Sequence, residues 1–112
     1  MTGALAEQWA ARYLQQRGLK LAGQNYRSRF GEIDLIMHDG EVLVFVEVRL
    51  RSSARFGGAA ASIDSRKQQR IVRTAECYLA AIAPVPPCRF DAVLMDDADG
   101  HNVQWIRNAF DA

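Results

Sequence analysis

Three carboxylates stand within two apolar stretches of the sequence, where a pair of β-strands would otherwise bury only apolar groups. Glu32 and Asp34 lie in residues 31–36, and Glu47 lies in residues 44–49. A carboxylate beside apolar neighbours is unfavourable unless it is paired or bound to a metal, and carboxylate oxygens are ligands that Mg²⁺ prefers. The pattern therefore indicates a divalent cation site. The alternative is the polar face of an ordinary antiparallel hairpin, which also shows alternating charges.

The spacing of these residues depends on the turn between the two stretches. Asp39-Gly40 between two alternating apolar runs is the strongest short-range signal for a β-hairpin. If this dipeptide forms the turn, Glu32 lies opposite Glu47, and Asp34 lies opposite Phe45. A loop one residue longer would turn the second strand over and separate Asp34 from Glu47. With the shorter loop, alternation of side chains places four charged groups on one face: Glu32, Asp34, Glu47 and Arg49.

Basic residues are concentrated just after this hairpin. Residues 49–73 contain seven of them against a single acid, Asp64: Arg49, Arg51, Arg55, Arg66, Lys67, Arg70 and Arg73. A basic segment beside a carboxylate face suits a phosphate backbone that approaches a metal. The alternative is a solvated arginine-rich surface. The net charge of the whole chain, +1, favours neither.

Length and composition set broader bounds. The 112 residues, 49% of them hydrophobic, predict one globular domain spanning residues 1–112. The start of the sequence lacks a signal-peptide pattern, and no apolar run approaches the ~18 residues of a membrane span. We therefore expect a cytoplasmic protein with no membrane segment. Cys77 and Cys88 lack metal-site spacing and are expected to be buried free thiols.

The order of elements that must position these residues is α-β-β-β-α-β-β. Apolar spacing predicts a helix from Thr2 or Gly3 to Gln16, which Gly18 ends. A second helix, capped by Ser62 or Asp64, presents Arg66, Arg70 and Arg73 opposite its apolar stripe and stops before three prolines, Pro84, Pro86 and Pro87. The remaining elements are a strand near 19–26, the hairpin 31–51, a loop at 52–61, and strands at 89–95 and 101–106 around a turn at Asp99-Gly100.

Several motifs together carry a family resemblance over nearly the whole chain. They are Glu7 with Ala10, Ala11, Tyr13 and Leu14; Gly18; residues 25–27; 31–36; 45–49 with Arg51; Phe56-Gly57; Lys67; 89–91; and 108–110. The sequence resembles the YraN-type (UPF0102) bacterial family, whose members are similar to Holliday-junction resolvases and other proteins with the restriction-endonuclease fold. The resemblance implies an α/β core with a mixed sheet flanked by helices. It also implies Mg²⁺ (or Mn²⁺) as cofactor and nucleic acid as partner, with DNA favoured over RNA.

Residue by residue, the nuclease pattern makes Asp34 and Glu47 metal ligands, with the carbonyl of Val48 as a third. Glu7 matches a glutamate that some resolvases use at the metal, or it is a solvent-facing residue near a helix N-terminus. Glu32 either supports the site or completes the turn into its strand. The pattern has lysine where this chain has Arg49, and arginine cannot accept a proton.

Two functions follow from the resemblance. The first is a Mg²⁺-dependent endonuclease that acts on branched, single-stranded or otherwise structured nucleic acid, with catalytic roles for Asp34, Glu47 and Arg49. The alternative is a nuclease-fold binding protein in which Arg49 marks weakened catalysis. In both, the phosphates are held by the basic segment: Arg51, Arg55, Arg66, Lys67, Arg70 and Arg73. A homodimer is a further expectation, because resolvases cut two strands symmetrically.

Overall fold

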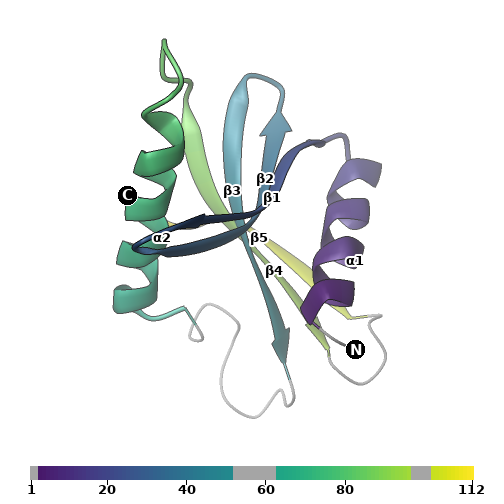
Figure 1. Cartoon of the computed structure of the whole chain (residues 1–112). Coiled ribbons are helices and arrows are strands. Elements are labelled where there is room, and N and C mark those ends of the chain that lie inside the picture. Colours follow the sequence, from purple (N-terminus) through teal and green to yellow (C-terminus); the bar gives the residue numbers. More distant parts are fainter. Residues whose placement is uncertain (1–2, 52–62, 97–101) are drawn as a thin grey trace.

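The protein folds as a five-stranded sheet with one helix on each face (Figure 1). The computed structural model describes residues 3–51, 63–96 and 102–112. The elements are α1 (Gly3–Gln16), β1 (Lys20–Ser28), β2 (Gly31–Asp39), β3 (Val42–Arg51), α2 (Ser65–Leu79), β4 (Cys88–Asp96) and β5 (Val103–Phe110). The expected order of elements is confirmed. The expected loop at 52–61 and the turn at Asp99-Gly100 lie outside the described residues.

The sheet is mixed, as the resemblance implied. Its strands lie in chain order from β1 to β5. β3 and β4 run parallel, and every other neighbouring pair is antiparallel. The central strands carry near-continuous apolar sequence because both faces of the sheet are covered. This α/β architecture is consistent with a restriction-endonuclease-like core.

The first helix covers one face of the sheet because its small and apolar residues recur at intervals of four. Ala6, Ala10 and Leu14 are fully or almost fully buried against residues of β2, β3 and β4. The helix ends as predicted, because Gly18 adopts φ +97°, a conformation that residues with a side chain rarely take. This packing fixes the direction of Glu7, which stands beside the buried stripe.

The second helix covers the opposite face. Asp64 is its N-cap, and the Asp64 carboxylate accepts a hydrogen bond of 2.8 Å from the backbone NH of Lys67. Ile71, Thr74 and Ala75 are buried, and the helix packs against a cluster that includes Phe45 and Phe90. The expected apolar stripe is thus present, although Tyr78 and Leu79 are half-buried and Ile82 follows the helix rather than belonging to it.

The turn between β2 and β3 differs from the prediction. Asp39 pairs with Val42, so the loop is Gly40-Glu41, and only Gly40 has a positive φ, at +60°. Glycine at the first loop position suits a type II′ turn, which matches the strand twist with one left-handed residue instead of two. The predicted pairing of Asp34 with Phe45 was therefore wrong, because Phe45 lies opposite Ile36.

The corrected register retains the predicted face of the hairpin. In the observed register each residue of β2 lies opposite a residue of β3 that is two positions later than predicted. Side chains alternate with a period of two, so a shift of two positions does not change which face they occupy. Asp34 and Glu47 therefore still share a face. The shift brings them closer along the strands than predicted, because Leu35 pairs with Val46 immediately beside them.

The β1–β2 hairpin reaches across to α2 (Figure 1). Ser28 pairs with Gly31, so Arg29 and Phe30 are its two loop residues. Ser28 Oγ lies 3.0 Å from Thr74 Oγ1. A Cβ atom at Gly31 would stand 3.6 Å from the Cβ of Arg70, and Gly31 has φ +152°. The positive φ favours glycine at this position, and the hairpin end lies in ordinary van der Waals range of the helix.

The cysteine prediction was wrong in part. Cys77 is half-buried and Cys88 is exposed, because Cys88 begins β4 at the border of the sheet; both thiols are free, as expected. None of the helices in the described ranges is both long enough and apolar enough to cross a membrane.

Candidate functional site

The candidate site lies where β2 separates from β3. Their pairing begins at the turn and ends with Leu35 and Val46, beyond which β2 continues beside β1 and β3 continues beside β4. Asp34 is the first residue of β2 past this point. Its Oδ2 accepts a hydrogen bond of 2.8 Å from the backbone NH of Val48. A side-chain carboxylate thus takes the place of the missing strand partner and holds Asp34 in position. We call this place, where β2 and β3 separate beyond Leu35 and Val46, the fork.

Three carboxylates converge at the fork from two elements. One oxygen each of Glu7, Glu32 and Asp34 lie within 4.8 Å of one another. Glu7 comes from α1, and the other two come from β2. All three side chains are half-buried. The expected role of Glu7 beside Asp34 thus has a geometric basis, and Glu32 joins the same cluster.

Glu47 lies on the other side of Asp34 and faces α2. It is 5% exposed, and its Oε2 lies 3.0 Å from Nζ of Lys67. That oxygen has no hydrogen-bond partner of good geometry among the described residues. The contact is therefore an ion pair that leaves acceptor capacity on a buried oxygen. A buried carboxylate with spare capacity is suited to a further cationic ligand.

Burial and crowding disfavour the ionised form of Asp34. Removal from water, followed by the hydrogen bond and charge of the neighbouring Glu47 carboxyl, raises the pKa of Asp34 to about 9. Burial also raises the pKa of Glu7, although a hydrogen bond with Asn25 acts in the opposite direction. Without a cation, the cluster therefore retains a proton at neutral pH.

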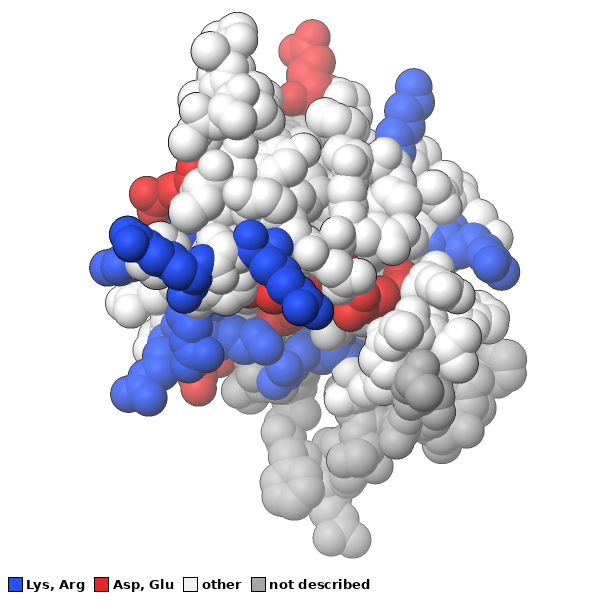
Figure 2. Space-filling model, viewed as in Figure 1, with Lys and Arg blue, Asp and Glu red and all other residues white. Residues whose placement is uncertain are grey.

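Basic groups border the carboxylates. A cleft of about 150 Å³ is lined by residues of β2, β3 and α2: Gly31, Glu32, Asp34, Glu47, Lys67, Arg70 and Ile71. Arg27 Nε donates a hydrogen bond of 2.7 Å to Glu32. Figure 2 shows acidic side chains across the middle of this face, with basic side chains above and below them. Acidic and basic groups therefore lie next to one another on this face.

Most of the other predicted site residues lie outside the cleft that holds the carboxylates. Arg49 shares the Glu47 face two residues along β3, at the position paired with Leu94. Arg51 ends β3 beside Asp96, and Arg55 lies outside the described residues. Arg66, Arg70 and Arg73 are exposed on α2, and of these only Arg70 lines the cleft.

Sequence reasoning assigned Lys67 to phosphate binding and missed its contact with Glu47. The available signal was helical spacing. With Asp64 as the N-cap, Lys67 lies at the third helical position, one turn before buried Ile71 and therefore on the side of α2 that faces the sheet. Helical spacing alone does not show how far along β3 the helix α2 lies, so it could not predict which residue Lys67 contacts.

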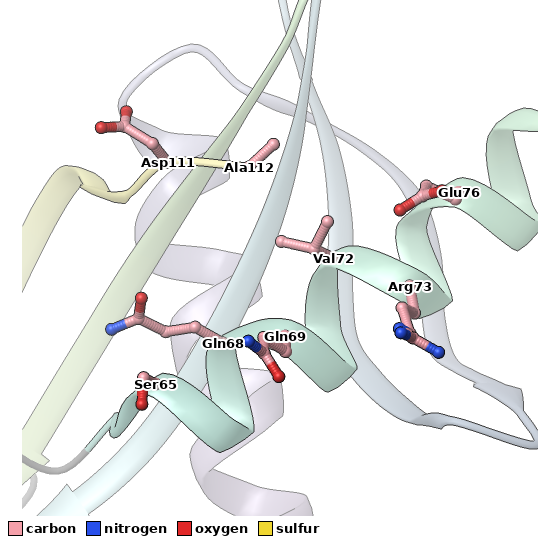
Figure 3. A pocket seen from close by; sticks show the side chains of 8 residues that line it. All are labelled: Ser65, Gln68, Gln69, Val72, Arg73, Glu76, Asp111 and Ala112. Atoms are coloured by element: carbon pink, nitrogen blue, oxygen red, sulfur yellow. The ribbon is translucent and has the colours of Figure 1, made fainter.

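A second cavity is larger but lacks comparable chemistry. It measures about 370 Å³ and lies between α2 and the C-terminal residues Asp111 and Ala112. Its two carboxylates, Glu76 and Asp111, stand at opposite ends of the group in Figure 3. They do not converge on a point where one ion could sit.

The carboxylates of the fork fit a hard divalent cation. Mg²⁺ binds through one or a few carboxylates and completes its octahedral shell with water and phosphate oxygens. Glu7, Glu32, Asp34 and Glu47 supply such oxygens, and the spare acceptor capacity of Glu47 and the retained proton of Asp34 both mark a deficit of positive charge. Neither cysteine nor histidine is present in the cluster, so the donors are unlike those of a structural zinc site.

Comparison with known proteins agrees with the sequence resemblance. A family model described as "Uncharacterised protein family UPF0102" matches residues 6–95. A UPF0102 protein of Nitrosomonas europaea is 60% identical over 109 residues, which cover 97% of this chain and 92% of the relative. One of Nitrosospira multiformis is 52% identical over 111 residues, covering 99% and 93%. One of Methylococcus capsulatus is 49% identical over 113 residues, covering 100% and 92%. The chain therefore belongs to the UPF0102 family.

Proposed function

We propose that this protein is a Mg²⁺-dependent endonuclease that acts on structured nucleic acid. The observation that carries the proposal is the fork between β2 and β3. There, carboxylates from α1, β2 and β3 meet the ammonium group of Lys67 from α2. An acidic cluster that also holds a partly buried ammonium, on a face bordered by arginines, suits phosphodiester hydrolysis, because a bound metal and a nearby cation both stabilise the charge that develops on the phosphate.

The residues divide the work by position. Asp34 would hold the cation together with Glu47, Glu7 and Glu32, and the backbone NH of Val48 fixes the orientation of the Asp34 carboxylate. A cation bound there supplies Lewis-acid polarisation of a phosphoryl oxygen. Arg70, which lines the cleft, would hold a phosphate of the substrate.

Lys67 can take the role of the lysine that this chain lacks at position 49. Nuclease patterns place a lysine two residues after the glutamate, where this chain has Arg49. Lys67 presents a compact ammonium group 3.0 Å from the Glu47 carboxylate, so α2 supplies the point charge that the strand lacks. We propose that Lys67 stabilises the charge that develops on the phosphate, and that Arg49 contributes to binding.

The test is a cleavage assay on duplex, single-stranded, flap and four-way substrates, as DNA and as RNA, with Mg²⁺ or Mn²⁺. Asp34→Ala should abolish cleavage. Lys67→Ala should reduce the single-turnover rate by roughly 10²–10³-fold, as expected for the loss of one electrostatic donor. Arg49→Ala should mainly weaken affinity, and Arg49→Lys should change the rate little. The matched surface control is Arg12→Ala, on the exposed side of α1.

The alternative is a nuclease-fold protein that binds nucleic acid with little or no catalysis, a reading that Arg49 itself favours. It predicts binding without cleavage above the Asp34→Ala background on every substrate. Metal-dependent cleavage that survives in Asp34→Ala would instead come from a contaminant or from another site, and the proposed site would be lost. Equal rates in the parent and Lys67→Ala would remove Lys67 from the chemistry.

A further inference from the structure

The end of the β1–β2 hairpin places an aromatic ring within contact distance of two arginines, beside the acidic cluster. Phe30 is half-buried. The guanidinium carbon of Arg29 lies 4.8 Å from the ring centroid, and that of Arg73, from α2, lies 5.5 Å from it. Both arginines are exposed. Such distances are those of cation–π contacts, which bring positive charge to the ring.

The position of Phe30 is fixed by several contacts. Its backbone NH donates a hydrogen bond of 3.0 Å to Ser28 Oγ, which lies 3.0 Å from Thr74 Oγ1 of α2. Thr74 Oγ1 in turn donates to the carbonyl of Arg70 at 2.8 Å. These hydrogen bonds hold the backbone of Phe30 against α2.

An open cavity lies against this ring. It measures about 470 Å³ and is lined by Phe30, Arg73, Glu76, Cys77 and Ala80. Its walls therefore offer an aromatic face, a guanidinium group and one carboxylate. A nucleobase can stack on the ring, its phosphate can pair with arginine, and a carboxylate can accept a hydrogen bond from an amino group of the base.

The cavity is close to the proposed catalytic site. Glu32 follows Phe30 by two residues, so their Cα atoms are at most about 7 Å apart. Gly31 follows Phe30 directly in the chain, and it lines the acidic cleft together with Arg70. A nucleotide chain that crosses the cleft therefore meets the ring within a short distance of the carboxylates.

We propose that Arg29, Phe30 and Arg73 form a clamp for one unpaired nucleotide of the substrate. The proposal rests on the proposed function and adds the substrate class: nucleic acid with an unstacked base next to the bond that is cut, as at a gap, flap, junction or single strand. A continuous duplex offers no such base to the ring, because its bases are stacked on one another.

The test measures binding apart from cleavage. Asp34→Asn serves as the common background, in EDTA, with three oligonucleotide probes made as DNA and as RNA. They are a single strand, a duplex with one unpaired 2-aminopurine, and the matched continuous duplex. The clamp predicts tighter binding of the first two probes and a fluorescence change of the 2-aminopurine. Phe30→Leu should lose roughly five- to 150-fold in affinity for them, the range for one stacked base, while Phe30→Trp should retain it.

The matched controls separate stacking from charge and from folding. Arg29→Ala should weaken the binding of the same two probes. Arg17→Ala should leave their binding unchanged; it removes an arginine whose guanidinium carbon lies 3.5 Å from the ring centroid of Tyr13 on α1. The melting temperature of each variant shows whether it folds. Equal affinity for all three probes, or a preference that persists in a folded Phe30→Leu protein, overturns the clamp.

The two proposals fail in different ways. If the protein binds the unpaired base through Phe30 but cleaves no substrate, the proposed function is wrong and the clamp is supported. A protein that cleaves with Asp34 intact, at a rate and affinity that Phe30→Leu leaves unchanged, keeps the function and loses the clamp.

Discussion

At the scale of single residues, the fork brings several carboxylates close enough to repel one another. Glu7, Glu32 and Asp34 share a region 4.8 Å across, and Glu47 stands beside Asp34. Lys67 and Arg27 offset this charge from the two sides, at 3.0 Å from Glu47 and 2.7 Å from Glu32. Burial and the neighbouring Glu47 carboxyl together raise the pKa of Asp34. Its chemistry should therefore respond to added cations and to pH.

Divalent cations should stabilise the protein through Asp34. A ligand that binds only the folded state adds about 2.7 kcal/mol to the free energy of unfolding at one hundred times its Kd. We expect Mg²⁺ or Mn²⁺ to raise the melting temperature of the parent, and Asp34→Asn to abolish the increase while the protein remains folded. Asp111→Asn, an exposed carboxylate in the C-terminal segment, is the control. A rise in Asp34→Asn equal to that of the parent would exclude Asp34 as a ligand.

In the absence of metal, stability should fall as the pH rises. The folded-state pKa of Asp34, about 9, exceeds the ordinary value of 3.8. Between these values the folded protein holds a proton that the unfolded chain releases, so unfolding is favoured progressively as the pH increases. The slope is at most about 1.4 kcal/mol per pH unit for one proton. Melting temperatures in EDTA should therefore decline across this window in the parent and decline less in Asp34→Asn. Parallel curves for the two proteins would contradict the assignment.

At the scale of elements, a buried carboxylate joins the last two strands. Asp91 of β4 is fully buried. Its two oxygens accept hydrogen bonds from Arg89 Nε at 3.1 and 3.2 Å, from Trp105 Nε1 at 2.9 Å and from the backbone NH of Asn108 at 3.0 Å. The register of β4 and β5 shifts between Phe90 and Ala92, next to this group. Asp91 thus takes over bonding where the regular ladder is interrupted.

Asp91→Ala should reduce the free energy of unfolding by roughly 3–5 kcal/mol, as for other buried ion pairs that lose one partner. Trp105→Phe, which removes one donor and keeps an aromatic ring, should lose about 1.5–3 kcal/mol. Urea denaturation of the two variants and the parent measures both effects. A loss below about 1 kcal/mol for Asp91→Ala would show that other contacts hold β5 in place.

The exposed arginines of α2 should bind phosphates as a group. Replacing Arg66, Arg70 and Arg73 with glutamine should weaken nucleic-acid binding and reduce the salt dependence of log K by about 0.7–0.9 for each lost phosphate contact. The control with the same change in charge is Arg12, Arg17 and Lys20, which are exposed on α1 and at the start of β1. If both triple variants lose the same affinity and slope, net charge alone explains the effect and α2 has no special role.

The elements themselves could be predicted from the sequence because their signals are local. Gly18 ends α1 and Asp64 begins α2, and each depends on a few neighbouring residues. The register of β2 and β3 was harder, because Asp39-Gly40 and Gly40-Glu41 are both acceptable two-residue loops. The face shared by Asp34 and Glu47 was still predicted correctly, since a change of two residues leaves the alternation intact. The contact of Lys67 with Glu47 depends on how two elements dock, which no local pattern encodes.

At the scale of the whole molecule, the fork makes one site from both faces of the sheet. α1 packs on one face and α2 on the other. In a continuous sheet, side chains from opposite faces are separated by the strands themselves. Here β2 and β3 separate beyond Leu35 and Val46, so Glu7 from α1 joins Glu32 and Asp34 while Lys67 from α2 contacts the neighbouring Glu47. This meeting explains why the site draws on residues far apart in the chain.

The parallel pairing of β3 and β4 imposes an order on folding. β1, β2 and β3 are joined by two-residue loops, and such hairpins form in about 1–10 μs. β4 can pair with β3 only after the chain between Arg51 and Cys88 has closed a long crossover that contains α2. We therefore expect Asp34 and Glu47 to come together before α2 brings Lys67 to them. A partly folded chain would then hold the acids without the ammonium group, and the complete arrangement would form only when the last elements are in place.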